Sequence, residues 1–286
     1  MTFKGYLKGY LLKGEYTEII SFHVLPTLST NPTLQDYLYN RSIPIQNNMD
    51  YKNVQAGLTK ENYWVRSKND LIDIFMKKVC KDDGQLKILN IGAGTGDDLE
   101  VLNKYGKNYV IDIDKEALSV IDSKWCEEKK VSDACNIPYD DNFFDIVVSC
   151  DVFEHIENDQ KAVSEVYRVL KEDSALLFTV PAFQFLFSSH DKALNHHRRY
   201  SKKMIRSRLS PFNDVNIFFW NSLFFIPIAV WRLVNRRSKP KVDHMDLPSW
   251  LNTLFFNLLK RDNFFIKRGV SIPVGLSIVG YGFKGK

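Results

Sequence analysis

The chain has 286 residues, of which 44% are hydrophobic, and a formal net charge of +5, so it is long enough for one substantial α/β core with extensions. Its four cysteines form no Cys-x-x-Cys pair and have no histidine at metal spacing, which argues against a zinc site and a disulfide framework. The sequence opens without a signal-peptide pattern and has no long uninterrupted apolar run, so secretion and a simple membrane span are disfavoured.

Residues 1–57 are predicted to be an N-terminal extension with a character of its own. The segment FKGYLKGYLLKG places Phe3, Tyr6 and Tyr10 on one helical stripe with lysines elsewhere, a pattern typical of a basic amphipathic helix on a membrane surface. Its three glycines lower the helix propensity, which favours instead a short element packed on the core or over the active site. Asn31 and Pro32 predict the start of a second helix.

Residues 59–81 predict a helix that leads into the segment 87–96, which reads KILNIGAGTG. This segment begins as a strand covered on both faces, and its three glycines allow a tight turn and a close approach of the backbone to a ligand. Asp112 follows Gly92 by twenty positions, at the end of a second apolar run, where a carboxylate can accept hydrogen bonds from ribose hydroxyls. Strand, glycine loop and helix together indicate a site for a nucleotide-type cofactor.

The spacing of the glycines separates two classes of cofactor. The dinucleotide pattern G-x-G-x-x-G requires glycine at position 97, where this chain has Asp97 followed by Asp98. Two carboxylates at the start of a helix would repel a pyrophosphate, but they would tolerate a ligand that carries an ammonium and a sulfonium. The loop therefore favours S-adenosylmethionine over NAD.

At this point the chain resembles the class I S-adenosylmethionine-dependent methyltransferases, and the resemblance continues through the fifth predicted strand. It implies an α/β fold with a Rossmann-like seven-stranded sheet whose last strand is antiparallel. In that family the acidic residue after the second strand holds the ribose, the one after the third reads the adenine, and the end of the fourth lies under the methionine part. The implied cofactor residues are Gly92, Ala93, Gly94, Gly96, Asp112, Ile113, Asp133, Ala134, Cys150 and Asp151.

Two short segments resemble a branch of this family whose members often act in pathways of surface glycans or lipid-linked saccharides. The segment ENYWVRSKNDLI resembles the stretch that precedes the first strand in that branch, which implies that Arg66 reaches the carboxylate of the cofactor. Residues 190–200, HDKALNHHRRY, match its HDxxxxHxRRY element. Because ligands bind at the carboxyl ends of parallel strands, this element is the predicted acceptor site.

An oxygen acceptor needs a general base near neutral pH, which makes histidine the expected residue. His190 or His196 is the first choice, and His155, after the fourth strand, is a competitor. No metal is expected, because no second group of ligands accompanies these histidines along the chain. The residues expected to bind an anionic acceptor are Asp191, Arg198, Arg199 and Tyr200.

Residues 214–221 and 271–284 predict the last two strands, and a helical insertion, 222–268, lies between them. Its apolar faces, bordered by tryptophans and arginines, fit a membrane dock, a lid over the site or a dimer face. Residues 192–241 hold twelve Lys or Arg and one acid, so this belt carries +11 and the remainder of the +5 chain carries −6. A belt of this kind attracts phosphates, unless it is only a solvated face.

The sequence therefore predicts that residues 58–286 form a cytoplasmic S-adenosylmethionine-dependent methyltransferase of a small-molecule or lipid-linked acceptor, acting at oxygen rather than at carbon or nitrogen. Peripheral membrane contact stays open. A nucleic-acid methyltransferase that uses the basic belt is the first alternative, although the chain lacks an Asn/Asp-Pro-Pro-Tyr/Phe element. A cofactor-binding protein without catalysis is the second alternative, and an NAD-dependent oxidoreductase is the third.

Overall fold

The computed structural model describes residues 62–80, 85–236, 239 and 247–286. The predicted N-terminal extension, with its two expected helices, lies outside the described residues, and so does part of the predicted insertion. Among the described helices, none combines the length and the apolar composition needed to cross a membrane.

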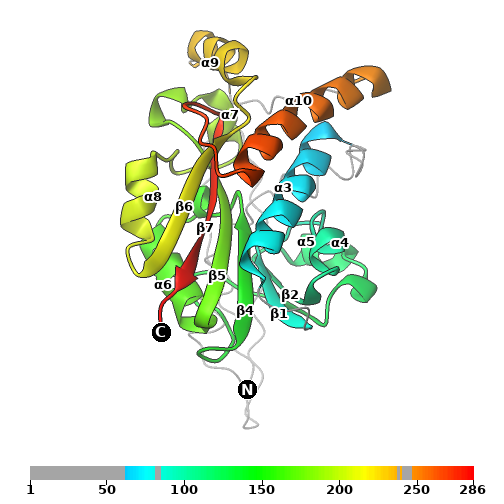
Figure 1. Ribbon diagram of the computed structural model, residues 1–286, viewed down its shortest axis with the longest axis vertical. Helices are drawn as coiled ribbons and strands as arrows, with labels where there is room; N and C mark the ends of the chain where they lie inside the picture. The colour runs from blue at the N-terminus through cyan, green and yellow to red at the C-terminus, as the bar shows by residue number, and fades with distance from the viewer. Residues whose placement is uncertain (1–61, 81–84, 237–238, 240–246) are drawn as a thin grey trace, which may run out of the picture. The chain divides into compact units, whose positions relative to one another are not determined.

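A seven-stranded sheet organises the described part of the chain (Figure 1), in the order β3-β2-β1-β4-β5-β7-β6. Neighbouring strands are parallel except at β7, which runs antiparallel to both β5 and β6. The expected α/β class, with a Rossmann-like sheet and an antiparallel last strand, is confirmed. The strands are β1 (Leu86–Ile91), β2 (Gly106–Asp112), β3 (Glu128–Val131), β4 (Phe144–Cys150), β5 (Leu170–Pro181), β6 (Phe212–Trp220) and β7 (Ser277–Lys284).

Helices connect and cover these strands, and two of them, α9 and α10, lie in the predicted insertion. The helix expected over 59–81 is α3. The described α-helices are α3 (Tyr63–Val79), α4 (Leu99–Leu102), α5 (Lys115–Val120), α6 (Asp159–Val169), α7 (Ser189–Ala193), α8 (Lys202–Arg208), α9 (Phe225–Val234) and α10 (Ser249–Lys267). The short 3₁₀ helices are η1 (Ser123–Trp125), η2 (Phe153–His155) and η3 (Gln184–Leu186).

The buried stretches of the central strands are mainly apolar because both of their faces are covered. On β4, Ile146 and Val148 join the apolar cluster that includes residues of α3 and α10, whereas Val147 belongs to the cluster that includes α6. All three side chains are at most 3% exposed. Alternate side chains of one strand therefore point into two separate cores, one on each side of the sheet.

Helix α10 lies beside α3 (Figure 1). The buried side-chain amide of its Asn263 forms hydrogen bonds with the core. The Asn263 side chain donates hydrogen bonds to the Ser67 carbonyl at 3.0 Å and to Asp70 Oδ2 at 2.7 Å, and it accepts one from Trp220 Nε1 at 2.8 Å. Asn263 thus joins α10 to α3 and to the end of β6. The second helix of the insertion is consequently part of the packed domain.

Candidate functional site

The glycine loop after β1 adopts a backbone that requires its glycines. Gly92, Gly94 and Gly96 have φ angles of 64°, 52° and 81°, in the left-handed region that other residues rarely adopt. A Cβ atom added to Gly92 would lie only 2.5 Å from Val152 Cγ2, in the segment after β4. The loop is therefore turned tightly against the end of β4, with Ala93 between its first two glycines.

Asp112 is the last residue of β2 and stands beside this loop. Its carboxylate is only 8% exposed, and it accepts hydrogen bonds from the Gly94 amide at 2.9 Å and from the Asp114 amide at 2.8 Å. Burial raises the pKa of this carboxyl group, while the two amide donors act in the opposite direction. The position matches the one expected for the ribose carboxylate.

The two aspartates that open the helix after the loop have different surroundings. Asp98 is 5% exposed and accepts a hydrogen bond from the Asn90 side chain at 2.7 Å, and burial raises its pKa. Asp97 is half-buried, and its carbonyl accepts a hydrogen bond from Asn69 of α3. Asp98 therefore fastens the loop to β1, and Asp97 is the more accessible of the two carboxylates.

The other residues expected to hold the cofactor lie after β2, after β3 and at the end of β4. Asp133 accepts a hydrogen bond from the Cys135 amide at 2.8 Å, and its neighbour Ala134 is buried. Ile113 is 41% exposed just beyond β2. Burial raises the pKa of the Cys150 thiol at the end of β4, and Asp151 follows it with a φ of 57°. All of them follow carboxyl ends of parallel strands, as the sequence predicts.

Arg66, expected to reach the cofactor carboxylate, lies on α3. Its guanidinium carbon is 4.1 Å from the centroid of the Phe256 ring on α10, a distance typical of a cation–π contact. The structure thus places Arg66 between the helix that precedes β1 and the second helix of the insertion.

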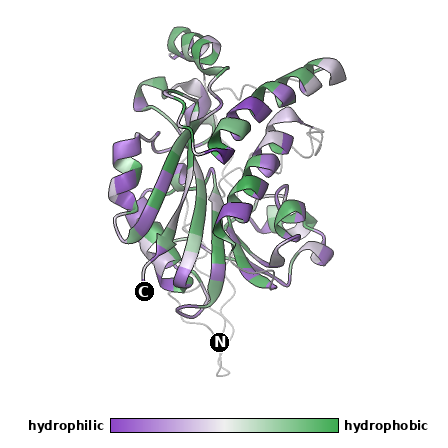
Figure 2. Ribbon diagram, in the orientation of Figure 1, coloured by the Kyte–Doolittle hydropathy of each residue, from purple (hydrophilic) through white to green (hydrophobic). Residues whose placement is uncertain are grey.

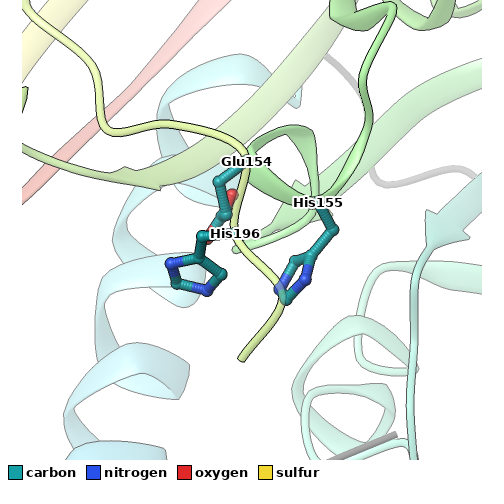
Figure 3. A group of neighbouring side chains, drawn as sticks. All are labelled: Glu154, His155 and His196. Carbon is teal, nitrogen blue, oxygen red and sulfur yellow. The ribbon is translucent and has the colours of Figure 1, made fainter. Parts of the chain in front are cut away.

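Folding brings together two of the three candidate bases, from segments forty residues apart. The rings of His155 and His196 meet edge to face, with centroids 4.6 Å apart, and Glu154 lies beside them (Figure 3). Main-chain hydrogen bonds fix this approach, from the His197 amide to the Glu154 carbonyl at 2.8 Å and from the His196 amide to the Asp191 carbonyl at 2.9 Å. The cluster therefore belongs to a rigid part of the fold, just beyond β4.

Asp191 is the centre of a buried polar network in the HDxxxxHxRRY element. Its carboxylate is fully buried and accepts hydrogen bonds from His196 Nδ1 at 3.0 Å and Arg199 Nε at 2.7 Å. It also accepts one from the Ser188 amide, which caps α7. The bond from His196 and the charge of Arg199 outweigh burial and lower the pKa of this carboxyl group.

The remaining residues of the element are also engaged inside the protein. Arg198 donates to the carbonyls of Ile156 and Glu157, which follow η2. The hydroxyl of Tyr200, a side chain with no exposed area, donates to Asp159 Oδ2 at 2.9 Å. Asp191, Arg198, Arg199 and Tyr200, expected from the sequence to bind the acceptor, therefore contact the chain itself and hold α7 and the loop after β4 together.

Burial also sets the charge state of the histidines. It lowers the pKa of His155 and of His190 to about 4, so both imidazoles are neutral at pH 7. His190 lies on α7, where the charges of Asp191 and His196 also act on it. Neutral imidazoles can accept a proton or donate a lone pair to a cation.

Glu154 is the residue that reasoning from sequence did not select. It is 1% exposed, burial raises the pKa of its carboxyl group well above the usual range, and its Oε2 has no hydrogen-bond partner in the structure. The sequence did offer one indication: Glu154 stands directly before His155 in a largely apolar stretch, where a buried carboxylate needs a partner.

Several cations of the basic belt, residues 192–241, form ion pairs with carboxylates of the same chain. Arg198 and Arg208 lie 3.0 and 2.8 Å from the carboxylate of Asp159, and Arg199 and Arg232 lie 2.7 and 3.6 Å from that of Asp191. Four of its twelve cations are therefore directed at two buried carboxylates of the same chain.

Comparison with known proteins agrees with this geometry. Residues 89–178 match the family model described as "Methyltransferase domain". The chain is 29% identical to an uncharacterized methyltransferase, YcgJ of Bacillus subtilis, over 55% of this chain and 65% of that protein. The crystal structure of YcgJ superimposes with a TM-score of 0.52 at 19% identity, covering 75% of this chain and 99% of that one, which shows the shared fold.

Two further relatives carry named activities. The chain is 30% identical to phosphoethanolamine N-methyltransferase 2 of Caenorhabditis elegans, over 36% of this chain and 26% of that protein. It is 27% identical to malonyl-[acyl-carrier protein] O-methyltransferase of Geobacter sulfurreducens, over 46% of this chain and 57% of that protein. The chain thus spans less than two thirds of the length of each curated relative.

Residues 89–178 therefore match a methyltransferase domain, within a fold that the chain shares with YcgJ. S-adenosyl-L-methionine is the cofactor that this domain and fold imply, and the left-handed glycine loop with a carboxylate at the end of β2 fits it.

Proposed function

We propose that this chain is an S-adenosylmethionine-dependent methyltransferase that methylates a hydroxyl oxygen of a small-molecule or lipid-linked acceptor. The observation that carries the proposal is the meeting of Glu154, His155 and His196 just beyond β4, beside the residues assigned to the cofactor. Methylation of a hydroxyl requires the loss of its proton, and imidazole is the side chain best suited to accept one near neutral pH.

The residues proposed to hold the cofactor divide by the part they would contact. The backbone of the loop 92–96 would approach the cofactor closely, Asp112 and Ile113 would hold its ribose, and Asp133 and Ala134 its adenine. Cys150 and Asp151 would lie at the methionine part, and Arg66 would pair with its carboxylate. When bound, the cofactor supplies a methyl group on a sulfonium, which the chain must bring to the acceptor in line and without water.

His196 is the proposed proton acceptor among the three histidines. Asp191 accepts a hydrogen bond from its Nδ1, which leaves the lone pair of Nε2 available to accept a proton. The neutral ring of His155 lies edge to face against it. Asp191, Arg198, Arg199 and Tyr200 then act as positioning residues for this side of the site, a role that their internal contacts support.

Exposed apolar side chains on α9 support a lipid-linked acceptor and a peripheral membrane contact. Ile226, Val230 and Val234 are 72%, 57% and 77% exposed, and α9 is coloured mostly as hydrophobic in Figure 2. On its other side, α9 packs against η3 and the segment before β7, and Arg232 points to Asp191. A helix that meets lipid with one face and the acceptor site with the other would suit a substrate anchored in a membrane.

The nucleic-acid alternative is less well supported. Phosphate binding along 192–241 would need free cations, but Arg198, Arg199, Arg208 and Arg232 are directed at Asp159 and Asp191. Strong, salt-sensitive binding of RNA by the purified protein would revive this alternative.

Calorimetric titration with S-adenosylmethionine, S-adenosylhomocysteine and NAD tests the cofactor assignment. We expect the two adenosyl compounds to bind and NAD not to bind. Asp112→Asn should weaken adenosyl binding at least tenfold, because hydrogen bonds to a charged group contribute about 1.5–3 kcal/mol. Asp122→Asn, at an exposed carboxylate, is the control and should bind normally. Binding of NAD alone, or of none of the three, would contradict the proposal.

Formation of S-adenosylhomocysteine with hydroxyl-bearing saccharide and polyprenyl-linked acceptors tests the catalytic assignment. His196→Ala should lower turnover by about a hundredfold, a typical contribution of a general base, while its affinity for S-adenosylmethionine stays unchanged. Normal turnover in this variant would move the proton acceptor to another residue. Wild-type binding without transfer to any acceptor would favour the non-catalytic alternative.

A further inference from the structure

Three potential metal ligands converge just beyond β4. Glu154, His155 and His196 each offer one ligand atom, and these atoms all lie within 4.8 Å of one another (Figure 3). The first two follow β4 in η2, whereas His196 comes from the loop after α7. Two imidazoles and one carboxylate are a donor set typical of first-row transition metals in proteins.

Each imidazole already has one nitrogen held by an oxygen acceptor. His196 Nδ1 lies 3.0 Å from Asp191 Oδ1, and the two side chains are 7% and 0% exposed. His155 makes a hydrogen bond to the backbone of Leu194. Because a ring N–H given to a carboxylate or a carbonyl leaves the second nitrogen with a free lone pair, both rings have the outer contacts usual for metal-binding histidines.

Glu154 supplies an oxygen that the rest of the protein leaves unsatisfied. Its side chain is 1% exposed, and Oε2 is buried without a hydrogen-bond partner in the structure. Asp151 lies close enough for its negative charge to act on Glu154, and Arg199, the nearby cation, is hydrogen-bonded to Asp191. A buried carboxylate beside a second carboxylate, with a free oxygen, is stabilised by a cation.

We propose that Glu154, His155 and His196 bind a divalent transition-metal cation, such as Zn²⁺ or Mn²⁺, at the acceptor side of the cofactor site. Three protein ligands leave at least one coordination position open. Nitrogen ligands favour these cations over Mg²⁺ and Ca²⁺, which prefer oxygen donors alone. The expectation from sequence that no metal binds is revised, because the ligands and their outer contacts come from segments that only folding brings together.

The open position gives the cation a role in the reaction, and this step rests on the proposed function. A hydroxyl oxygen that binds a divalent cation has a lowered pKa, so its proton leaves to solvent. The oxygen would then form the new O–CH₃ bond as the S–CH₃ bond of the cofactor breaks, with S-adenosylhomocysteine as the leaving group. With the cation bound, Nε2 of His196 is a ligand, so solvent replaces His196 as the proton acceptor, and Asp191 orients the ring. The acceptor class narrows to molecules whose hydroxyl can reach a metal.

Direct titration of the full-length, chelator-treated protein with Zn²⁺ and with Co²⁺ tests the proposal without any acceptor. We expect one tightly bound cation per chain, and a visible Co²⁺ spectrum that indicates nitrogen ligands. His196→Ala and Glu154→Gln should weaken binding at least a hundredfold, and Asp191→Asn about ten- to a hundredfold, as substitutions of outer contacts do. His197→Ala, at the exposed neighbouring histidine, is the matched control and should bind normally.

Calorimetric binding of S-adenosylmethionine by every variant shows that its fold is intact, and His155→Asn replaces any variant that fails this criterion. Absence of stoichiometric cation binding by the wild-type protein, or unchanged affinity in His196→Ala, would overturn the proposal. Adenosyl binding without cation binding refutes the metal site and leaves the proposed function standing. Cation binding without adenosyl binding refutes the proposed function and leaves the metal site standing.

Discussion

Asp191 is a buried carboxylate that contacts one imidazole and two guanidinium groups from different parts of the fold. His196 and Arg199 contact Oδ1, and Arg232 of α9 lies 3.6 Å from Oδ2. The Asp191 carboxylate has no exposed area, and the Arg199 guanidinium that it neutralises is 3% exposed. Removing the carboxylate should therefore destabilise the fold strongly, because the Arg199 charge would stay buried and unpaired.

Substitution of this carboxylate should therefore affect stability as well as the site. We expect Asp191→Asn to lower the free energy of unfolding by about 3 kcal/mol, as the loss of one partner of a buried ion pair typically does. Urea unfolding measures the effect. Asp173→Asn, which removes an exposed partner of Lys286, is the control and should cost less than about 1 kcal/mol. Equal stabilities of the two variants would show that the Asp191 network does not hold the site together.

The places in the fold of the residues proposed to hold the cofactor could be predicted, because these places follow from the order of strands. Asp112 ends β2 and Asp133 lies two residues after β3, and a parallel sheet brings such positions to one edge. The HDxxxxHxRRY residues could not be assigned in this way. Whether Arg199 or Tyr200 faces a substrate or a buried carboxylate depends on partners eight and forty-one residues away along the chain.

The turn between β1 and α4 depends on the segment that follows β4. Gly92 has a φ of 64°, and a Cβ there would press on Val152. Gly269, after α10, has a similar φ of 74°, but a Cβ there would meet no atom within 4 Å. A side chain at Gly269 would therefore cause backbone strain alone, whereas a side chain at Gly92 would cause both strain and a steric clash.

Alanine substitutions at both glycines should give different results. Gly269→Ala should cost about 1–2 kcal/mol, the strain of a left-handed residue alone. We expect Gly92→Ala to cost more and to weaken S-adenosylmethionine binding more than tenfold, since the loop must move away from Val152. Adding Val152→Ala should recover the stability lost to the clash but not that lost to strain. Equal costs at Gly92 and Gly269, measured by thermal unfolding, would contradict this account.

Element boundaries were less predictable than element types. The second strand was expected to follow its apolar run, 109–113, but β2 begins at Gly106, because the ladder with β1 pairs Gly106 with Leu86. The polar Asn108 is accommodated inside by side-chain hydrogen bonds to the carbonyls of Leu99 and Trp125. Before the buried part of β5, Asp173 takes a φ of 57°, a left-handed conformation that glycine adopts more readily.

At the scale of the whole molecule, the part of the insertion that the structure describes contains two helices with different exposure. Helix α10 is tied to α3 and β6 by Asn263, which periodicity alone did not predict. Helix α9 is largely exposed, with Arg236 and Lys239 also exposed just after it. An apolar helical face next to cations fits the surface of an anionic bilayer, where the apolar side chains contact the acyl chains and the cations contact the headgroups.

Flotation of the full-length protein with phosphatidylglycerol-containing vesicles tests this contact. Val230 on α9 and Val131 on β3 are 57% and 56% exposed, so they form a matched pair of the same residue type on different surfaces. Val230→Glu should weaken vesicle binding at least tenfold, because it removes a valine whose burial in the bilayer would contribute about 1.5 kcal/mol and adds a charge repelled by anionic lipid. Val131→Glu should bind vesicles like the wild type. Raised salt should weaken the wild-type binding through the neighbouring cations, and equal flotation of both variants would place the membrane contact away from α9.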